Sequence, residues 1–133
     1  MKERNTKQKE DILKIIKNTK THPTMKEIYE LVKEINPTIG QATVYRNINK
    51  LTEDGNVVRI LDPNNECHYD GDISQHSHFI CTNCHKIIDI FDDYQKINKE
   101  LEQKYEFKVE NKIITYQGLC KKCIKNNDKK VVY

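Results

Sequence analysis

Two pairs of cysteines constrain the fold of this chain more than any other feature of its sequence. Each pair is a C-x-x-C segment, and the two segments read Cys81-Thr82-Asn83-Cys84 and Cys120-Lys121-Lys122-Cys123. One such segment lets two thiolates converge on one ion, and two segments complete the tetrahedral shell of a zinc ion with Zn–S bonds of about 2.3 Å. A single C-x-x-C would leave a redox role open, whereas two of them favour structural zinc. The sequence therefore predicts a structural Zn(II) site formed by these four cysteines.

The segment between the two pairs indicates that the zinc stabilises a domain. Residues 85–119 separate the pairs, and this is longer than the gap of about 15–20 residues that is typical of a zinc ribbon. The segment must contain secondary structure of its own, so an isolated finger is not expected. The fifth cysteine, Cys67, stands alone, and we interpret it as a spare thiol on a strand.

Composition excludes a membrane protein and leaves nucleic-acid binding open. Hydrophobic residues make up 36% and charged residues 32% of the chain, and no apolar run approaches the roughly 18 residues that a membrane span needs. The N-terminal segment is charged, unlike a signal peptide. We therefore expect a cytoplasmic protein with no membrane partner. The net charge of +3 permits DNA binding but does not indicate it.

The first half of the chain has the pattern of a winged helix-turn-helix. Apolar residues recur at helical spacing, and turn residues separate the elements. The predicted elements are three helices, over 7–19, 23–35 and 41–54, and a β-hairpin with strands at 57–61 and 66–69. In a winged helix-turn-helix, the third helix enters the major groove of DNA and the hairpin, or wing, lies along the backbone.

The outward face of the third predicted helix offers side chains that suit DNA. Basic side chains bind phosphates or guanine edges, and a tyrosine packs on a thymine methyl group. The candidate DNA contacts are Gln41, Thr43, Tyr45, Arg46, Asn47 and Lys50 on this helix and Arg59 on the wing. Charge alone would equally describe a solvated helix face. The order of the elements, together with the basic and aromatic pair, favours DNA binding.

The second half of the chain is expected to form a separate α/β domain. Strands over 79–80 and 87–90 surround the first cysteine pair, a helix over 92–105 follows, and two further strands between Phe107 and Tyr116 lead to the second pair. The chain is thus predicted to be an α+β protein in three parts. These are a winged-helix DNA-binding domain at 1–70, a hinge at 71–75 and a metal-binding domain at 76–133.

A second group of metal-binding side chains precedes and follows the first cysteine pair. His76 and His78 form an H-x-H segment, and side chains two residues apart on a strand point to the same side. With His22, Asp70 and Asp89 they offer nitrogen and oxygen donors, which suit Fe(II), Mn(II) or Zn(II). Each histidine taken alone would be an ordinary loop or capping residue, but the set indicates an exchangeable metal site. His68 and His85 lack comparable partners, and we predict that they are not ligands.

These motifs resemble those of the ferric uptake regulator family. Their order and spacing match the family over nearly the whole chain. The matching segments are His22-Pro23-Thr24, Ala42-Thr43-Val44-Tyr45-Arg46-Asn47, His76-x-His78-x-x-Cys81-x-x-Cys84 and Cys120-x-x-Cys123. The resemblance implies a homodimer, held by the domain at 76–133, whose winged helices bind an inverted repeat in double-stranded DNA once a regulatory metal is loaded.

Within this family, the ligand set resembles that of the peroxide-sensing branch. That branch uses a histidine, an aspartate, an H-x-H pair and a second aspartate, which correspond to His22, Asp70, His76, His78 and Asp89. Iron-sensing members commonly carry glutamate at the position of Asp89, and zinc-sensing members often carry cysteine at that of Asp70. The resemblance implies regulatory Fe(II) or Mn(II) at these five residues.

The resemblance also implies a mechanism, in which the protein senses peroxide and is not an enzyme. Loaded metal would tie the two domains together in the DNA-binding arrangement, and peroxide reacting at Fe(II) would oxidise His22 or His76 and release DNA. Mn(II) would hold the two domains in the same arrangement without this reaction. Three alternatives remain: sensing of iron or manganese availability on the same scaffold, a hydrolytic zinc site, and a zinc-containing interaction module that does not bind DNA.

Overall fold

The chain forms two compact units, Met1–Ile73 and Ser74–Tyr133, which we call unit 1 and unit 2 and describe separately. The computed structural model describes residues 2–92, 94–110 and 112–127. Both units contain helices and strands, and the predicted α+β class is confirmed. None of the helices in these described ranges is long and apolar enough to cross a membrane.

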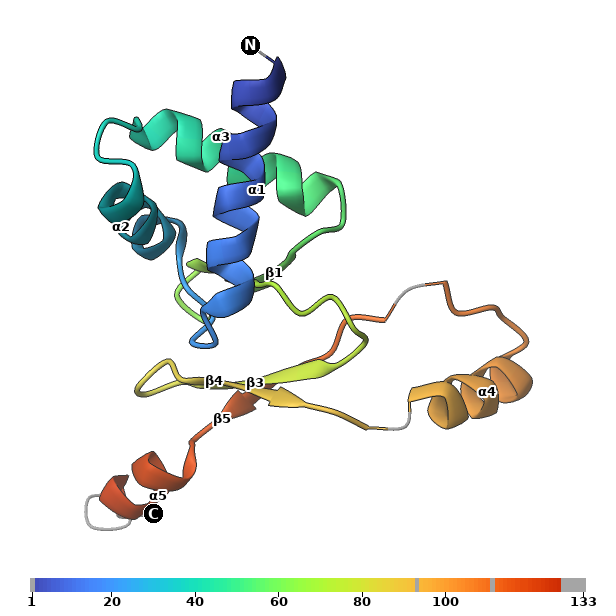
Figure 1. Cartoon of the computed structure of the whole chain (residues 1–133). Coiled ribbons are helices and arrows are strands. Elements are labelled where there is room, and N and C mark those ends of the chain that lie inside the picture. The colour runs from blue at the N-terminus through green and yellow to red at the C-terminus, as the bar shows by residue number, and fades with distance from the viewer. Residues whose placement is uncertain (1, 93, 111, 128–133) are drawn as a thin grey trace. The chain divides into compact units, whose positions relative to one another are not determined.

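Unit 1 has the architecture of a winged helix-turn-helix (Figure 1). Its elements are α1 (Lys2–Asn18), α2 (Met25–Ile35), α3 (Gln41–Glu53), β1 (Val58–Leu61) and β2 (Cys67–Asp70). The three helices contact one another, and β2 contacts α1 and α2. The two strands form an antiparallel hairpin in which Val58 lies opposite Asp70 and Leu61 opposite Cys67. The wing is therefore attached to the helices through β2.

Apolar side chains from all three helices meet in the core of unit 1. Residues one turn apart on each helix point to the same side, as Ile12 and Ile16 do on α1, and both are completely buried. The core consists of Ile12, Ile16, Ile28, Val32, Ile39, Val44, Ile48, Leu51, Val57 and Tyr69. Full burial of one such aliphatic side chain contributes about 1.5–3 kcal/mol. Apolar packing of this extent fixes the position of α3.

Capping residues set the ends of the helices. Thr24 is the N-cap of α2, and it forms a capping box with Glu27. The Thr24 hydroxyl accepts the amide of Glu27, which is one of the free amides of the first turn. The predicted start of α2 at Pro23 is therefore wrong by two residues. Gly40 is the N-cap of α3, which begins at Gln41 as predicted. Gly55 follows α3 with φ +77°, a conformation that glycine adopts without strain.

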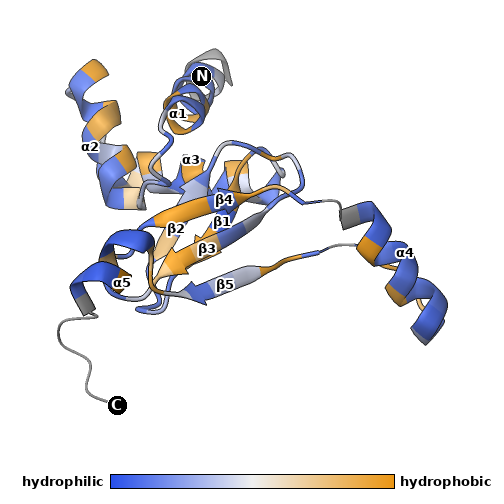
Figure 2. Ribbon diagram, turned by 90° about the horizontal axis from the view of Figure 1, so that it is seen from below, coloured by the Kyte–Doolittle hydropathy of each residue, from blue (hydrophilic) through white to orange (hydrophobic). Residues whose placement is uncertain are grey.

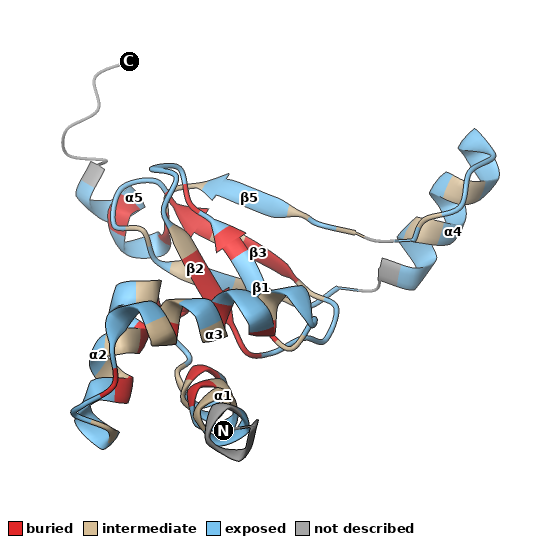
Figure 3. Cartoon of the chain, turned by 90° about the horizontal axis from the view of Figure 1, so that it is seen from above, coloured by how far each residue is buried: buried red, intermediate tan, exposed pale blue. Residues whose placement is uncertain are grey.

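Unit 2 contains a small mixed sheet and two helices. Its elements are β3 (Ser77–Cys81), β4 (Ile87–Ile90), α4 (Tyr94–Tyr105), β5 (Thr115–Gly118) and α5 (Lys121–Asn127). Strand β3 is central, with β4 antiparallel on one side and β5 parallel on the other. Figure 3 shows that the buried residues of the sheet are concentrated on β3. The central strand carries His78 and ends at Cys81, so it positions members of both predicted metal sites.

The helix α4 extends away from this sheet and leaves apolar side chains exposed. Figure 2 shows the apolar residues of α4 among polar ones on a helix that stands apart from the strands of unit 2. Ile97 is 43% exposed, Leu101 is 38% exposed and Tyr105 is 57% exposed. The α4 face that carries these three residues therefore has no covering layer within the described part of unit 2.

Other elements also differ from the prediction. Helix α1 begins at Lys2, and α5 was not predicted. In the described residues between Phe107 and Tyr116, β5 is the one strand, so the prediction of two strands is wrong. The amide of Val109 donates instead to the Glu102 carboxylate at 2.9 Å. That side chain of α4 thus takes the place of a neighbouring strand.

Candidate metal centre and nucleic-acid interface

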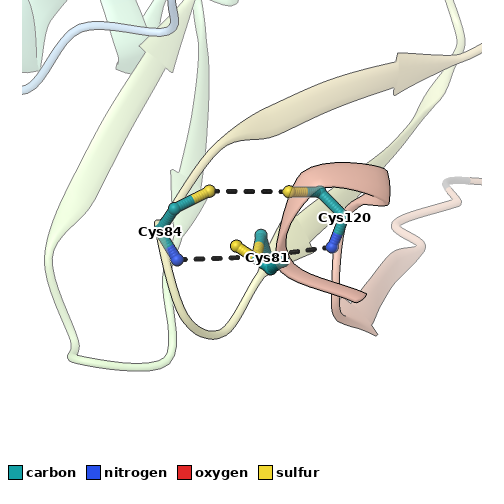
Figure 4. A group of neighbouring side chains, drawn as sticks. Cys81, Cys84 and Cys120 are labelled. Carbon is teal, nitrogen blue, oxygen red and sulfur yellow. Dashed lines mark hydrogen bonds between the residues drawn. The ribbon is translucent and has the colours of Figure 1, made fainter. Parts of the chain in front are cut away.

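The four cysteines of the two C-x-x-C segments converge in unit 2, and Figure 4 shows three of them, Cys81, Cys84 and Cys120. Cys81 ends β3, Cys84 lies in the following turn, Cys120 immediately precedes α5 and Cys123 lies in its first turn. Their sulfur atoms all lie within 4.8 Å of one another, and Cys84 Sγ is 3.7 Å from Cys120 Sγ. Sulfurs at the corners of a zinc tetrahedron with bonds of about 2.3 Å are about 3.8 Å apart. The arrangement fits one tetrahedral zinc ion.

Backbone hydrogen bonds fix the turn that carries the first cysteine segment and attach it to the strand that leads to the second. The amide of Thr82 donates to the carbonyl of Gly118 at 2.7 Å, and the amide of Cys81 donates to the carbonyl of Lys86 at 2.9 Å. The first bond joins the turn after β3 to the end of β5, which are adjacent in the parallel register. The sheet therefore brings the second segment beside the first.

Amide groups around Cys81 favour its thiolate, the form that binds metal. Its sulfur accepts the Cys120 amide at 3.4 Å and the Cys84 amide at 3.5 Å. Burial raises the pKa of the Cys81 thiol, but these hydrogen bonds outweigh burial and lower the pKa to about 5. The Asn83 side chain donates to Cys123 Sγ at 3.3 Å. Such donors around a metal centre orient the ligands and reduce the repulsion between thiolates.

Two of the five predicted regulatory ligands are paired in unit 1. His22 Nε2 lies 3.4 Å from Asp70 Oδ2, and both residues are buried. His22 precedes α2, and Asp70 is the last residue of β2. Two ligands at right angles and about 2.1 Å from an ion lie about 3 Å apart, so this nitrogen and this oxygen are close enough to share one ion.

The other three predicted ligands are grouped in unit 2. Asp89 lies opposite His78 in the antiparallel register of β3 and β4. Its Oδ1 atom is 3.3 Å from the Nε2 atoms of both His76 and His78. His76 Nδ1 is 2.6 Å from the carbonyl of Ser74, and a carbonyl only accepts, so this nitrogen carries the proton. Nε2 of His76 is thereby left as the lone-pair donor that a metal requires.

Phe91 is a neighbour of this group that the sequence analysis missed. Its ring stacks on that of His76 with centroids 4.8 Å apart and planes 25° apart. Phe91 lies two residues after Asp89, directly after β4. In a single sequence, an aromatic residue at this place only weakly indicates a contact with a metal ligand. The stacking restricts the orientation of the His76 imidazole.

The predicted DNA contacts lie on the accessible face of α3, at the margins of that face beside the core, and on the wing. Gln41, Arg46, Lys50 and Arg59 are exposed, and Thr43, Tyr45 and Asn47 are partly buried. The side-chain amide of Gln41 donates to the hydroxyl of Tyr45 at 3.0 Å, and the guanidinium of Arg46 donates to the hydroxyl of Thr43 at 3.3 Å. These contacts along the helix orient the polar side chains.

Asp54 lies beside this face and was not singled out in the sequence. Its carboxylate is 2.6 Å from Lys9 Nζ and 3.7 Å from Lys50 Nζ. The hydrogen bond from Lys9 holds the pKa of Asp54 below its usual value. The contact with Lys9 joins residues of α1 to the end of α3, which a local sequence pattern does not show.

Comparison with known proteins places the chain in a family. The sequence model of the ferric uptake regulator family matches residues 1–117. The chain belongs to this family. Its members are metal-responsive repressors, and the predicted resemblance is confirmed.

Individual relatives within the ferric uptake regulator family include both metal and peroxide regulators. The Bacillus subtilis ferric uptake regulation protein is 32% identical over 124 residues, which cover 89% of this chain and 83% of that protein. The peroxide-responsive repressor of Staphylococcus aureus strain USA300 is 30% identical over 119 residues, which cover 89% of this chain and 80% of that protein. These identities support the family for this chain and do not separate its branches.

Solved structures of the family share the fold. The Campylobacter jejuni peroxide stress regulator is 35% identical, with a TM-score of 0.80 over 90% of this chain and 91% of that one. Other structures with this fold are ferric uptake regulators with iron and with manganese, and a zinc uptake regulator with zinc and DNA.

Proposed function

We propose that this chain is a metal-dependent transcriptional repressor that binds double-stranded DNA as a homodimer and responds to peroxide. The observation that carries the proposal is the distribution of the nitrogen and oxygen ligands. The His22 and Asp70 pair belongs to unit 1, whereas His76, His78 and Asp89 belong to unit 2. One Fe(II) or Mn(II) ion held by all five residues would fix the winged helix relative to unit 2.

The domain assignment follows from this arrangement. In the proposal, residues 1–70 bind DNA, residues 71–75 act as a hinge, and residues 76–133 hold the metals and form the dimer. DNA as the partner implies a cytoplasmic location. Closure of a two-state hinge by a ligand shifts the equilibrium toward the arrangement that the ligand binds more tightly. Metal loading would therefore favour the form in which both winged helices reach an inverted repeat.

The exposed apolar residues of unit 2 support the homodimer. The α4 face with Ile97, Leu101 and Tyr105 is uncovered, and Phe107 is 51% exposed beside it. The rings of Tyr105 and Phe107 stack at 5.9 Å, so they form one apolar surface. Exposed apolar patches of this kind on a soluble domain mark association surfaces. A second copy of this chain is the proposed occupant.

The four thiolates are proposed to hold Zn(II) permanently. Cys81, Cys84, Cys120 and Cys123 form a closed set with no carboxylate or imidazole, which is the donor set of a structural site. They link the end of β3 to the start of α5 and so fix the end of the sheet at which β3 and β5 finish. Zinc here would stabilise unit 2 and take no part in the response to peroxide.

The exposed polar face of α3 is proposed to read the operator. Arg46 is exposed on a helix that Val44, Ile48 and Leu51 anchor in the core of unit 1. Tyr45, next to it, is half-buried and packs partly against that core. Arg59 on β1 is exposed, and it is proposed to bind the phosphate backbone. A recognition helix and a wing of this kind are typical of winged helix-turn-helix proteins on DNA.

Peroxide sensing is proposed from the donor set. Fe(II), when bound, supplies the redox chemistry through which hydrogen peroxide oxidises a ligand imidazole. One oxygen atom is added to the ring of His22 or His76, and the other leaves as water. An oxidised ring binds metal less well, so the link between the units is lost and DNA is released. Detection consumes the protein itself, which makes it a sensor.

Mass spectrometry separates this proposal from its main alternative. The Fe(II)-loaded and Mn(II)-loaded proteins are treated with equal peroxide and digested. We expect one added oxygen on the peptide with His22 or His76 in the Fe(II) form, together with loss of DNA binding, and no change in the Mn(II) form. Equal oxidation in both forms, or oxidation of cysteine alone, would contradict peroxide sensing. The 32% identical ferric uptake regulation protein supports the alternative, a repressor that senses iron or manganese availability.

A further inference from the structure

His22 adopts a backbone conformation that needs support from its surroundings. Its φ is +57°, in the left-handed region that few residues other than glycine adopt. The next residue is Pro23, and a residue before proline prefers an extended backbone. His22 is only 5% exposed, so its carbonyl depends on protein partners more than on water. The conformation of His22 is therefore maintained by the groups that contact its backbone.

One of these groups is the imidazole of His68 on strand β2. His68 Nδ1 lies 2.9 Å from the carbonyl oxygen of His22, and the ring nitrogen must donate, because a carbonyl only accepts. The next residues continue the contact: the amide of Tyr69 donates to the carbonyl of Pro23 at 2.9 Å, and Thr24 forms a β-bridge with His68. The segment that carries His22 is thus attached to the strand that ends at Asp70.

A buried carboxylate fixes His68 from the other side of its ring. His68 Nε2 lies 2.8 Å from Asp62 Oδ2, and Asp62 is only 4% exposed. The other oxygen of Asp62 accepts the amides of Asn64 and Glu66 at 2.8 Å and 3.0 Å. Burial raises the pKa of Asp62, but the hydrogen bonds from His68 and these amides outweigh it and keep the pKa below its usual value. The wing turn therefore holds the His68 ring in one orientation.

We propose that His68 is a positioning residue for the regulatory metal site, and that it acts by holding the backbone of His22. With this backbone fixed, His22 Nε2 faces Asp70 Oδ2 at 3.4 Å. Both ring nitrogens of His68 have protein partners, so His68 itself is not a ligand. The proposal rests on the proposed function, in which His22 and Asp70 bind Fe(II) or Mn(II). Residues that orient metal ligands typically change the affinity for the metal on the order of 10–100-fold.

Two amide side chains at position 68 separate positioning from a general contribution to folding. The NH2 group of asparagine lies near the place of Nδ1, and that of glutamine lies near the place of Nε2. The substitution His68→Asn therefore keeps a donor toward the His22 carbonyl, whereas His68→Gln keeps a contact to Asp62 and loses that donor. Ile60→Val is the matched control, because Ile60 is buried and lies opposite His68 in the hairpin. It changes packing at the same place and leaves the hydrogen bonds intact.

The experiment measures Mn(II) affinity in the zinc-loaded protein, by electron paramagnetic resonance of the free ion. We expect His68→Gln to weaken binding on the order of 10–100-fold, and His68→Asn and Ile60→Val to bind as wild type does. The absorption spectrum of Co(II) in place of Mn(II) should change for His68→Gln alone. Zinc content and thermal unfolding verify that each variant is folded.

Two results would overturn the role of His68. One is equal Mn(II) affinity in His68→Gln and wild type, and the other is an equal loss of affinity in His68→Gln and Ile60→Val. The variant His22→Ala tells this failure from failure of the proposed function. If His22→Ala weakens Mn(II) binding and His68→Gln does not, the metal site stands and the positioning role is wrong. If His22→Ala also leaves the affinity unchanged, the proposed site is wrong and the positioning role with it.

Discussion

Unit 1 and unit 2 are stabilised by different means, although each combines helices with a small sheet. In unit 1, aliphatic side chains of three helices form the core, and residues such as Ile12, Ile28 and Ile48 are completely buried. In unit 2, the buried cluster consists of Cys81, Cys120 and Cys123. Among the unit 2 side chains that the structure describes, Ile80 is the one buried aliphatic residue. The thiol groups occupy the place that apolar packing occupies in unit 1.

Because of this difference, the stability of each unit should be changeable without affecting the other. A small domain with little apolar burial requires a metal, a disulfide or a partner to be stable. Unit 2 offers two of these, a four-cysteine site and the uncovered face of α4. Unit 1 needs neither, because its core is closed. Loss of zinc should therefore destabilise unit 2, and loss of core packing should destabilise unit 1.

The largest expected effect is on unit 2, from Cys120→Ser. This change removes one thiolate from a closed shell, and zinc binding to such sites contributes about 10–16 kcal/mol to folding. We expect zinc to be lost, residues of unit 2 to unfold and the dimer to dissociate, while unit 1 stays folded. A two-dimensional amide spectrum shows this as collapse of the unit 2 resonances alone.

Cys67→Ser is the control for this prediction. Cys67 lies on β2 in unit 1, partly buried against its core, and this variant should keep zinc and both sets of resonances. Dispersed unit 2 resonances and an intact dimer in a zinc-free Cys120→Ser protein would contradict the proposed structural role.

The converse change, Ile48→Ala, should act on unit 1. Ile48 is 0% exposed in the centre of the core, and truncation of a buried isoleucine to alanine costs about 2–5 kcal/mol. Chemical denaturation should show unit 1 destabilised by this amount, with zinc content and the stability of unit 2 unchanged. Loss of zinc from Ile48→Ala would mean that the two units do not fold independently.

The fold was predictable where apolar spacing and turn residues agree. The start of α3 after Gly40 and its end before Gly55 follow from these signals. The first residues of α1 carry no apolar stripe, so periodicity placed its start at Lys7 instead of Lys2. The short helix α5 was missed because it begins between the two cysteines of the second pair and is too short to show a period. Apolar spacing indicates which part of a helix packs against the core. It does not show how far the helix continues into a polar segment such as the start of α1.

The candidate sites were predictable to the extent that spacing along the chain defines them. The cysteine pairs and the H-x-H segment are local patterns, and the structure brings the cysteines together and places His76 and His78 beside Asp89. The contacts of His68 with Asp62 and with the His22 backbone join three separate segments. No local pattern indicates them. Binding of one ion by all five regulatory ligands remains a prediction, because these residues are divided between the two units.

The smallest expected effect leaves both units folded and tests the surface of unit 1. Arg46 is exposed on α3, and its one described hydrogen bond to a side chain is to Thr43 at 3.3 Å, so Arg46→Ala should change neither the core nor the zinc site. A base-contacting side chain is worth about 1–3 kcal/mol of binding. With an inverted-repeat duplex selected from a random pool by the wild-type protein, Arg46→Ala should bind more weakly by this amount.

Lys50→Ala sharpens the same test. Lys50 lies near the end of α3, 3.7 Å from Asp54, and is expected to bind phosphate. Its loss should weaken binding to selected and random duplexes alike. It should also reduce the slope of the logarithm of the binding constant against the logarithm of the salt concentration by about one. Arg46→Ala should instead weaken binding to the selected duplex more than to the random one. If Arg46→Ala weakens binding to the selected and the random duplex equally, Arg46 binds the DNA backbone. Other side chains of α3 must then contact the bases, and Gln41 and Tyr45 are the nearest candidates.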